Sequence, residues 1–217
     1  MAARLVERIF PQWVWRLPVG CKSIALTFDD GPHPDTTPAL LAALQQLQIP
    51  STHFVLGSRC QENAPLIEAV RSSGHVIGSH GFDHASLAFK SASYQRETIR
   101  RTEDVIVNVL HERPHLFRPP YGHFNPLTST VLRRVKYTGV MWSLHVHDWA
   151  EQSLETLWKR LKNGLHEGAV IVLHDAQPTT DKVIRILPRL ADETARRGWS
   201  FVTLSSDTFD KLKITAP

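Results

Sequence analysis

The sequence predicts an α/β protein built on a mostly parallel sheet. Short apolar segments typical of buried strands alternate with helical segments about seven times along the chain. The links between these segments are short, and no low-complexity tract, repeat or domain linker interrupts them. This alternation is typical of a closed or partly open β/α barrel, or of an open doubly wound sheet.

Each predicted strand is a short apolar run, usually followed by turn-forming or polar residues. Residues 169–173, Ala-Val-Ile-Val-Leu, form the clearest buried strand, and Gly31-Pro32 ends the first one. The expected strands are 23–28, 52–56, 75–78, 116–118, 139–144, 169–173 and 200–204.

Helices are expected between these strands from capping residues and apolar stripes. Thr36 or Thr37 can cap the first helix, with Pro38 near its start, and Ser153 can cap a later one. The longest helical segment has an apolar stripe at helical spacing. The expected helices are 39–44, 65–71, 92–111, 127–135, 154–161 and 183–197.

Composition limits the functional classes. A chain of 217 residues with 42% apolar content can bury one sizeable core, and a net charge of +4 from scattered basic pairs does not support nucleic-acid binding. No apolar segment is long enough to span a bilayer. Cys21 and Cys60 are expected to be free thiols, a single bridge being the alternative, and the 12 histidines favour metal chemistry.

Residues 1–19 are expected to form an N-terminal extension that packs on a domain spanning 20–217. Phe10, Trp13 and Trp15 favour packing against the core, with contact to a membrane surface as the alternative. The first residues lack the apolar core of a signal peptide, which predicts a cytoplasmic protein, with a start or export route that this sequence does not display as the alternative.

Two adjacent carboxylates, Asp29 and Asp30, stand where the first predicted strand stops. Their repulsion favours a shared cation or an acid/base role, and an exposed turn is the alternative. Arg118, Asp148 and His174 also follow apolar strands. Parallel β/α folds build their active sites at such strand ends, so these residues are expected to share one site.

His80 and His84 are four residues apart, so on a helical turn both imidazoles would point the same way. The pair alone is weak evidence in a histidine-rich chain. Together with Asp30 from a neighbouring loop, it would supply two nitrogens and one oxygen and leave positions open for water and substrate. That arrangement is typical of catalytic zinc.

Five motifs, in order, resemble those of the polysaccharide deacetylases with the NodB homology domain, known as carbohydrate esterase family 4. The motifs are Thr27-Phe28-Asp29-Asp30-Gly31, His80-Gly81-Phe82-Asp83-His84, Arg118-Pro119-Pro120-Tyr121-Gly122, His145-Val146-His147-Asp148-Trp149 and Val172-Leu173-His174. The resemblance implies a distorted, partly open (β/α) barrel with about seven parallel strands. It also implies a metal-dependent hydrolase that removes N-acetyl groups from N-acetylglucosamine units of peptidoglycan or chitin-like oligomers.

The same resemblance implies a role for each motif residue. Asp30, His80 and His84 would hold a divalent ion, zinc or alternatively cobalt or nickel, which polarises the acetyl carbonyl and activates water. Asp29 would be the general base, oriented by Arg118.

For the later motifs, the resemblance implies that the backbone N–H of Tyr121 faces the oxyanion. His174 would be the general acid, favoured as imidazolium by Asp148 and packed by Trp149. The family often works outside the cytoplasm, in contrast to the location that the N-terminus predicts.

Two positions depart from the family pattern. His145 stands where the fourth motif commonly begins with Asp, which changes the charge near Arg118 or His174. Gly81 replaces a Ser or Thr whose hydroxyl could support the metal ligands. Alternatives are therefore an O-acetyl esterase or small-amide hydrolase on the same site, or a glycan-binding protein with little catalysis. The aromatic residues expected to stack on sugars are Phe82, Tyr121, Phe124 and Trp149.

Overall fold

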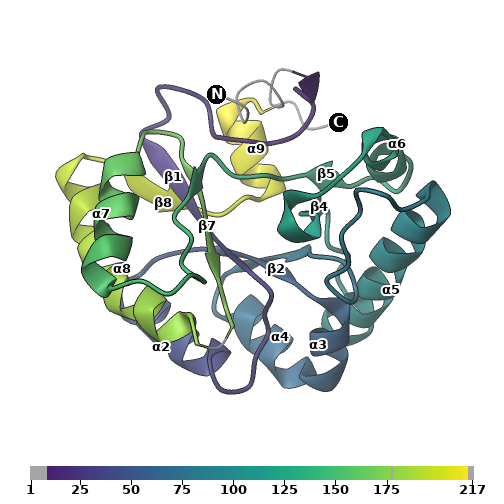
Figure 1. Ribbon diagram of the computed structural model, residues 1–217, viewed down its shortest axis with the longest axis horizontal. Helices are drawn as coiled ribbons and strands as arrows, with labels where there is room; N and C mark the ends of the chain where they lie inside the picture. The colour runs from purple at the N-terminus through teal and green to yellow at the C-terminus, as the bar shows by residue number, and fades with distance from the viewer. Residues whose placement is uncertain (1–8, 177, 215–217) are drawn as a thin grey trace.

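A curled parallel sheet surrounded by helices forms the framework of the computed structural model, which describes residues 9–176 and 178–214 (Figure 1). Its strands are β1 (Ser23–Asp29), β2 (Thr52–Val55), β3 (Val76–Ser79), β4 (Leu116–Phe117), β5 (Thr138–Gly139), β6 (Leu144–His145), β7 (Val170–His174) and β8 (Ser200–Val202). They pair in parallel in the order β5-β4-β3-β2-β1-β7-β6, and β8 also pairs with β1. Because β5 and β6 stand at opposite ends of this order, the sheet is a partly open barrel, as predicted.

Most of the helices lie on the outside of the curled sheet, whereas α9 (Ser206–Leu212) lies apart from them, near the top of the view (Figure 1). The other helices of the described residues are α2 (Thr37–Gln46), α3 (Gly57–Glu62), α4 (Ala64–Ser72), α5 (Ala92–Leu110), α6 (Pro126–Arg134), α7 (Leu154–Gly164) and α8 (Thr180–Arg196), with a 3₁₀ turn at η1 (Pro120–Gly122). Ser153 caps α7 as predicted, whereas neither Thr36 nor Thr37 makes a side-chain cap on α2. The short helices α3 and α9 were not predicted, because six or seven residues give too few turns for an apolar stripe.

The predicted strand 139–144 is wrong in one respect: it is two strands at opposite edges of the sheet. β5 pairs with β4, whereas β6 pairs with β7. Between them the chain crosses the opening of the barrel. The Met141 N–H donates to the Val14 carbonyl (2.8 Å) and the Ser143 N–H donates to the Val170 carbonyl (3.0 Å). An apolar pattern marks such a segment as extended but does not identify its partners.

Apolar packing fills both sides of the sheet. On one side, Phe28 and Leu173 join residues of α2, α7 and α8 in the largest core cluster. On the other side, Ala25 and Val170 pack with Phe54 and with Phe209 of α9. The sheet is therefore covered on both faces, as a parallel sheet requires.

The segment before β1 contributes two buried indoles. Trp13 and Trp15 pack with Phe117 and Tyr137, and Val14 forms a bridge with Val140. The proposed division of the chain into an extension, 1–19, and a catalytic domain, 20–217, falls partly on residues 1–8 and 215–217, which lie outside the described residues.

Two further expectations concern thiols and membranes. Cys21 and Cys60 are both free thiols, as predicted. Within the described ranges, the structure has no helix with both the length and the apolar character needed to cross a bilayer.

A buried pair of histidines lies near the starts of two neighbouring strands, with His53 in β2 and His75 directly before β3. The hydroxyl of Ser51 lies 3.0 Å from Nε2 of His53 and 3.0 Å from Nδ1 of His75. The His53 ring is also stacked on Phe28. Burial, together with the neighbouring His75, lowers the pKa of His53 to about 3, so His53 is neutral in the folded protein at neutral pH.

We expect the folded protein to lose stability as the pH falls below about 6.5, the ordinary pKa of histidine. The unfolded chain binds a proton at residue 53 that the folded chain rejects down to about pH 3. The linkage amounts to about 1.4 kcal/mol per pH unit for one such group. Urea unfolding at pH 7 and pH 5 measures the loss. The His53→Gln variant should show a smaller pH dependence, whereas the exposed His111→Gln should match the wild type.

Candidate active site

The register of the sheet brings the predicted site residues together at one edge. Asp29 and His174 are partners at the ends of β1 and β7. Ser79 and Phe117 are partners at the ends of β3 and β4, so the residues that follow them, His80 and Arg118, are neighbours too. All four residues therefore lie at the carboxyl ends of parallel strands, as predicted.

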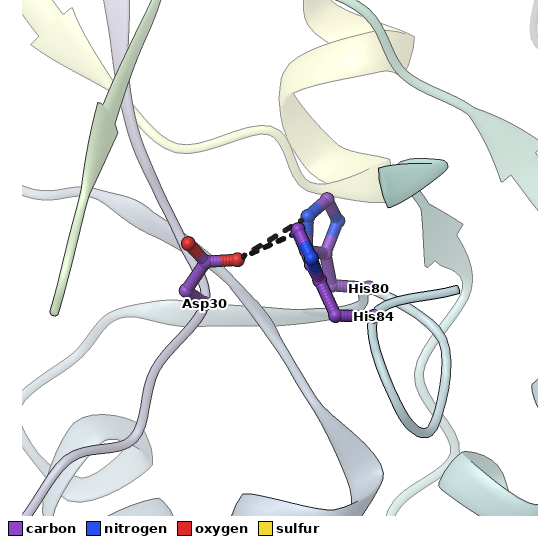
Figure 2. A group of neighbouring side chains, drawn as sticks. All are labelled: Asp30, His80 and His84. Atoms are coloured by element: carbon purple, nitrogen blue, oxygen red, sulfur yellow. Dashed lines mark ion pairs between the residues drawn. The ribbon is translucent and has the colours of Figure 1, made fainter. Parts of the chain in front are cut away.

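Asp30, His80 and His84 converge on one point (Figure 2). Oδ1 of Asp30 lies 3.1 Å from Nε2 of His84 and 3.6 Å from Nε2 of His80. One ligand atom from each residue lies within 4.8 Å of the others. Among the residues that the structure describes, this is the one group of three or more such side chains with metal-binding spacing.

The chemistry of these donors suits a divalent cation. Nδ1 of His80 lies 2.8 Å from the Arg118 carbonyl oxygen, which can only accept, so Nδ1 carries the proton. Burial lowers the pKa of His80, which keeps the ring neutral and leaves a lone pair on Nε2. That lone pair faces Oδ1 of Asp30, a buried oxygen without a hydrogen-bond partner. A cation bound by both atoms resolves this repulsion.

The carboxylate of Asp30 remains ionised. Burial by itself raises the pKa of Asp30, but the contact with His84 and the potential of the nearby histidines outweigh it, and the pKa lies below its ordinary value. Asp30 adopts a left-handed backbone conformation, with φ of 76°. Arg59 Nη1 donates to its carbonyl oxygen (2.9 Å), which helps to hold this conformation.

The expected helical turn between the two histidines is wrong. Residues 80–84 form an irregular loop, in which Gly81 and His84 have φ of 80° and 58°. These left-handed residues turn the loop back on itself, and the ring centroids of His80 and His84 are 5.2 Å apart. Gly81 is the residue type that takes such a conformation at no steric cost, which gives this departure from the family pattern a backbone reason.

Asp29 is held by a buried arginine. Nη1 of Arg118 donates to Oδ1 of Asp29 and to Oγ1 of Thr27, each at 2.7 Å. The other carboxylate oxygen, Oδ2, lies 3.9 Å from Nε2 of His80. Asp29 thus places one oxygen on Arg118 and the other beside the group of metal-ligating atoms.

Asp148 accepts hydrogen bonds from both the backbone and the ring of His174. Its Oδ2 accepts the backbone N–H of His174 and its Oδ1 accepts the Nδ1–H of the ring, each at 2.8 Å. Burial by itself lowers the pKa of His174, but the hydrogen bond to Asp148 and the surrounding carboxylates raise it to about 9. His174 is therefore a cationic proton donor at neutral pH.

The two remaining predicted residues lie on the rim of the site. The Tyr121 side chain is 61% exposed, and its ring packs edge-on against His84 with a centroid distance of 4.4 Å. Trp149 is 58% exposed, and its ring contacts His147 at 5.8 Å. The backbone role of Tyr121 and the packing of Trp149 on His174 stay predictions.

One residue absent from the sequence analysis, Asp175, secures the loop that carries Asp30. The buried Asp175 accepts hydrogen bonds from the hydroxyls of Thr36 (2.6 Å) and Thr37 (2.5 Å). Its N–H donates to the Asp29 carbonyl (2.9 Å), and a Cβ on Gly31 would meet its carboxylate at 2.8 Å. An acid directly after His174 was the available signal, because a carboxylate at the end of a buried strand needs a partner.

Comparisons with known proteins agree with this geometry. A family model described as polysaccharide deacetylase matches residues 16–140. A peptidoglycan-N-acetylglucosamine deacetylase of Bacillus cereus is 32% identical over 193 residues, covering 88% of this chain and 90% of that protein. A chitooligosaccharide deacetylase of a Bradyrhizobium species is 28% identical over 192 residues, covering 83% and 88%. A crystal structure of a peptidoglycan N-acetylglucosamine deacetylase superposes with a TM-score of 0.86, at 28% identity and 89% and 91% coverage.

We expect His80→Ala to reduce affinity for a divalent ion by more than about 100-fold, since the loss of residues that merely support a ligand costs about 10–100-fold. Asp29→Asn should stay within about tenfold of the wild type, because its oxygen is bound to Arg118. Titration calorimetry with Zn²⁺ and metal content after dialysis measure both, with thermal melting to verify folding. A larger loss of Zn²⁺ affinity in Asp29→Asn than in His80→Ala would contradict the assignment of Asp30, and not Asp29, to the metal.

Proposed function

Because this chain belongs to the polysaccharide deacetylase family, we propose that it is a metal-dependent hydrolase that removes N-acetyl groups from N-acetylglucosamine-containing glycans, either peptidoglycan or chitin-like oligomers. The observation that carries the proposal is the convergence of Asp30, His80 and His84 beside a carboxylate and a cationic histidine. Metal-assisted amide hydrolysis uses three groups of this kind: a Lewis acid, a base for water and an acid for the departing amine.

The metal site supports zinc as the proposed ion. Two imidazole nitrogens and one carboxylate oxygen, with positions left open, suit catalytic zinc, while cobalt and nickel accept the same donors. When bound, such an ion polarises the acetyl carbonyl and lowers the pKa of water.

Asp29 acts as the base in this proposal. It takes a proton from the attacking water while the water oxygen forms its bond to the carbonyl carbon. The hydrogen bond from Arg118 to Oδ1 of Asp29 leaves Oδ2 beside the metal ligands, which supports this role. The backbone N–H of Tyr121 stabilises the negative charge that develops on the acetyl oxygen.

His174 acts as the acid. As the carbon–nitrogen bond breaks, it donates its proton to the amine, so that acetate and a free amino sugar are released. Its hydrogen bond to Asp148 keeps Nδ1 occupied and leaves Nε2 as the donor. The pKa of about 9 means that His174 carries this proton at neutral pH.

Acetate release from chitotetraose and from peptidoglycan fragments tests the proposed function. We expect turnover that falls at least 100-fold after chelation and returns with Zn²⁺. Unchanged turnover after chelation would refute the metal role. Cleavage of acetylated xylan without cleavage of any amide would indicate an esterase, and metal and sugar binding without turnover would indicate a binding protein.

The pH profile tests the pairing of His174 with Asp148. For the wild type, kcat/KM should fall as the pH rises through about 9, where His174 loses its proton. Asp148→Asn removes the charge that raises this pKa, so its alkaline limb should move to lower pH and kcat should fall. An alkaline limb at the same pH in both proteins would remove His174 from the role of acid.

A further inference from the structure

Three ring side chains lead from the predicted acid to the surface. They are His145, His147 and Trp149, at alternate positions of one segment. The His145 ring lies 6.5 Å from that of His174 and 4.2 Å from that of His147, and the His147 ring lies 5.8 Å from Trp149. His145 is partly buried, whereas His147 and Trp149 are exposed, so these residues, here called the aromatic strip, extend from the site to solvent.

The reaction geometry defines what must lie on this side of the site. The nitrogen that receives the proton of His174 is bonded to the sugar, whereas the acetyl group lies toward the metal ligands. The sugar ring and its glycosidic neighbours must therefore leave the site on the side of His174. The aromatic strip begins beside His174, so His145 lies next to the group that protonates the sugar nitrogen.

The backbone of His147 adopts a left-handed conformation at an exposed position. Its φ is 53°, in the left-handed region that a non-glycine residue rarely adopts. The Ala150 N–H and the Gln152 side chain both donate to its carbonyl oxygen. These two hydrogen bonds hold the backbone at His147, and with it the ring beside His145, in one conformation.

The chemistry of the strip suits a carbohydrate. An indole and imidazole rings offer flat faces to the C–H groups of a pyranose, and imidazoles also exchange hydrogen bonds with hydroxyls. Burial, with the neighbouring histidines, lowers the pKa of His145 to about 4, so its ring is neutral at neutral pH and offers one donor and one acceptor.

We propose that His145, His147 and Trp149 bind the sugar ring that carries the reacting amide and the unit joined to it, and so select saccharide substrates over other acetylated compounds. This inference rests on the proposed function. His145 thereby acquires a role in substrate contact at the position where the family pattern commonly has Asp.

Direct binding tests the strip without relying on turnover. In an Asp29→Asn background with Zn²⁺ present, His147→Ala should raise the Kd for chitotetraose about tenfold, as expected for the loss of one well-packed ring contact. Titration calorimetry measures this change. In the otherwise wild-type enzyme, His147→Ala should raise KM for chitotetraose by a similar factor and change kcat by less than about twofold. KM for 4-nitrophenyl acetate, which has no sugar, should be unchanged.

His147→Gly separates sugar binding from folding. Glycine adopts a positive φ without strain, so this variant should melt at or above the wild-type temperature. It should nevertheless bind chitotetraose as weakly as His147→Ala does. Wild-type affinity in the glycine variant would overturn the proposal, because the strip would then have only a structural role.

His111→Ala is the matched control. His111 is also exposed and has φ of 53°, but it ends α5 ahead of β4, at the opposite edge of the sheet. The His111→Ala variant should bind chitotetraose with the same affinity as the parent protein. Equal losses of chitotetraose affinity in His147→Ala and His111→Ala, or no loss in His147→Ala, would refute the proposed role of the aromatic strip. Sugar binding that depends on His147 in a protein without turnover would refute the proposed function and leave the strip intact.

Discussion

The buried guanidinium of Arg118 is the interaction on which the rest of the site depends. It is 0% exposed and donates to Thr27 and Asp29, and also to the carbonyl oxygens of Val140 (3.4 Å) and Met141 (2.9 Å). The backbone carbonyl oxygen of Arg118 accepts a hydrogen bond from the ring N–H of His80. Leaving one member of a buried pair without its partner costs about 3–5 kcal/mol. One residue therefore orients the base and the crossing segment through its side chain, and a metal ligand through its backbone.

The crossing segment explains why an open barrel suits this site. The sheet does not close between β5 and β6, and the chain between them carries Trp142, whose ring lies 5.7 Å from the Arg118 guanidinium and 5.7 Å from the His145 ring. The same segment then continues into the aromatic strip and Asp148. Because the start of this segment is anchored on Arg118, its end lies beside His174. Arg118 therefore helps to position both the base, Asp29, and the acid, His174.

Two adjacent carboxylates take different environments because the backbone changes direction between them. Asp29 is the last residue of β1 and lies against Arg118. Asp30, with φ of 76°, turns toward His80 and His84. A strand alone would place consecutive side chains on opposite faces, but the left-handed turn lets both reach the same edge of the site. The hydrogen bonds from Arg59 and Asp175 hold the loop where this change occurs.

By itself the sequence determined the parallel fold, the strand ends and the polar residues that gather there, because periodicity and motif spacing are local properties of the chain. Only the tertiary structure decided that residues 139–144 divide between two sheet edges, that His80 and His84 meet through a loop, and that Asp175 secures Asp30. The tertiary structure also placed the His145 ring beside His174 and the His147 ring beside His145. Pairing partners, left-handed turns and ring contacts depend on residues distant in sequence, and no local pattern specifies them.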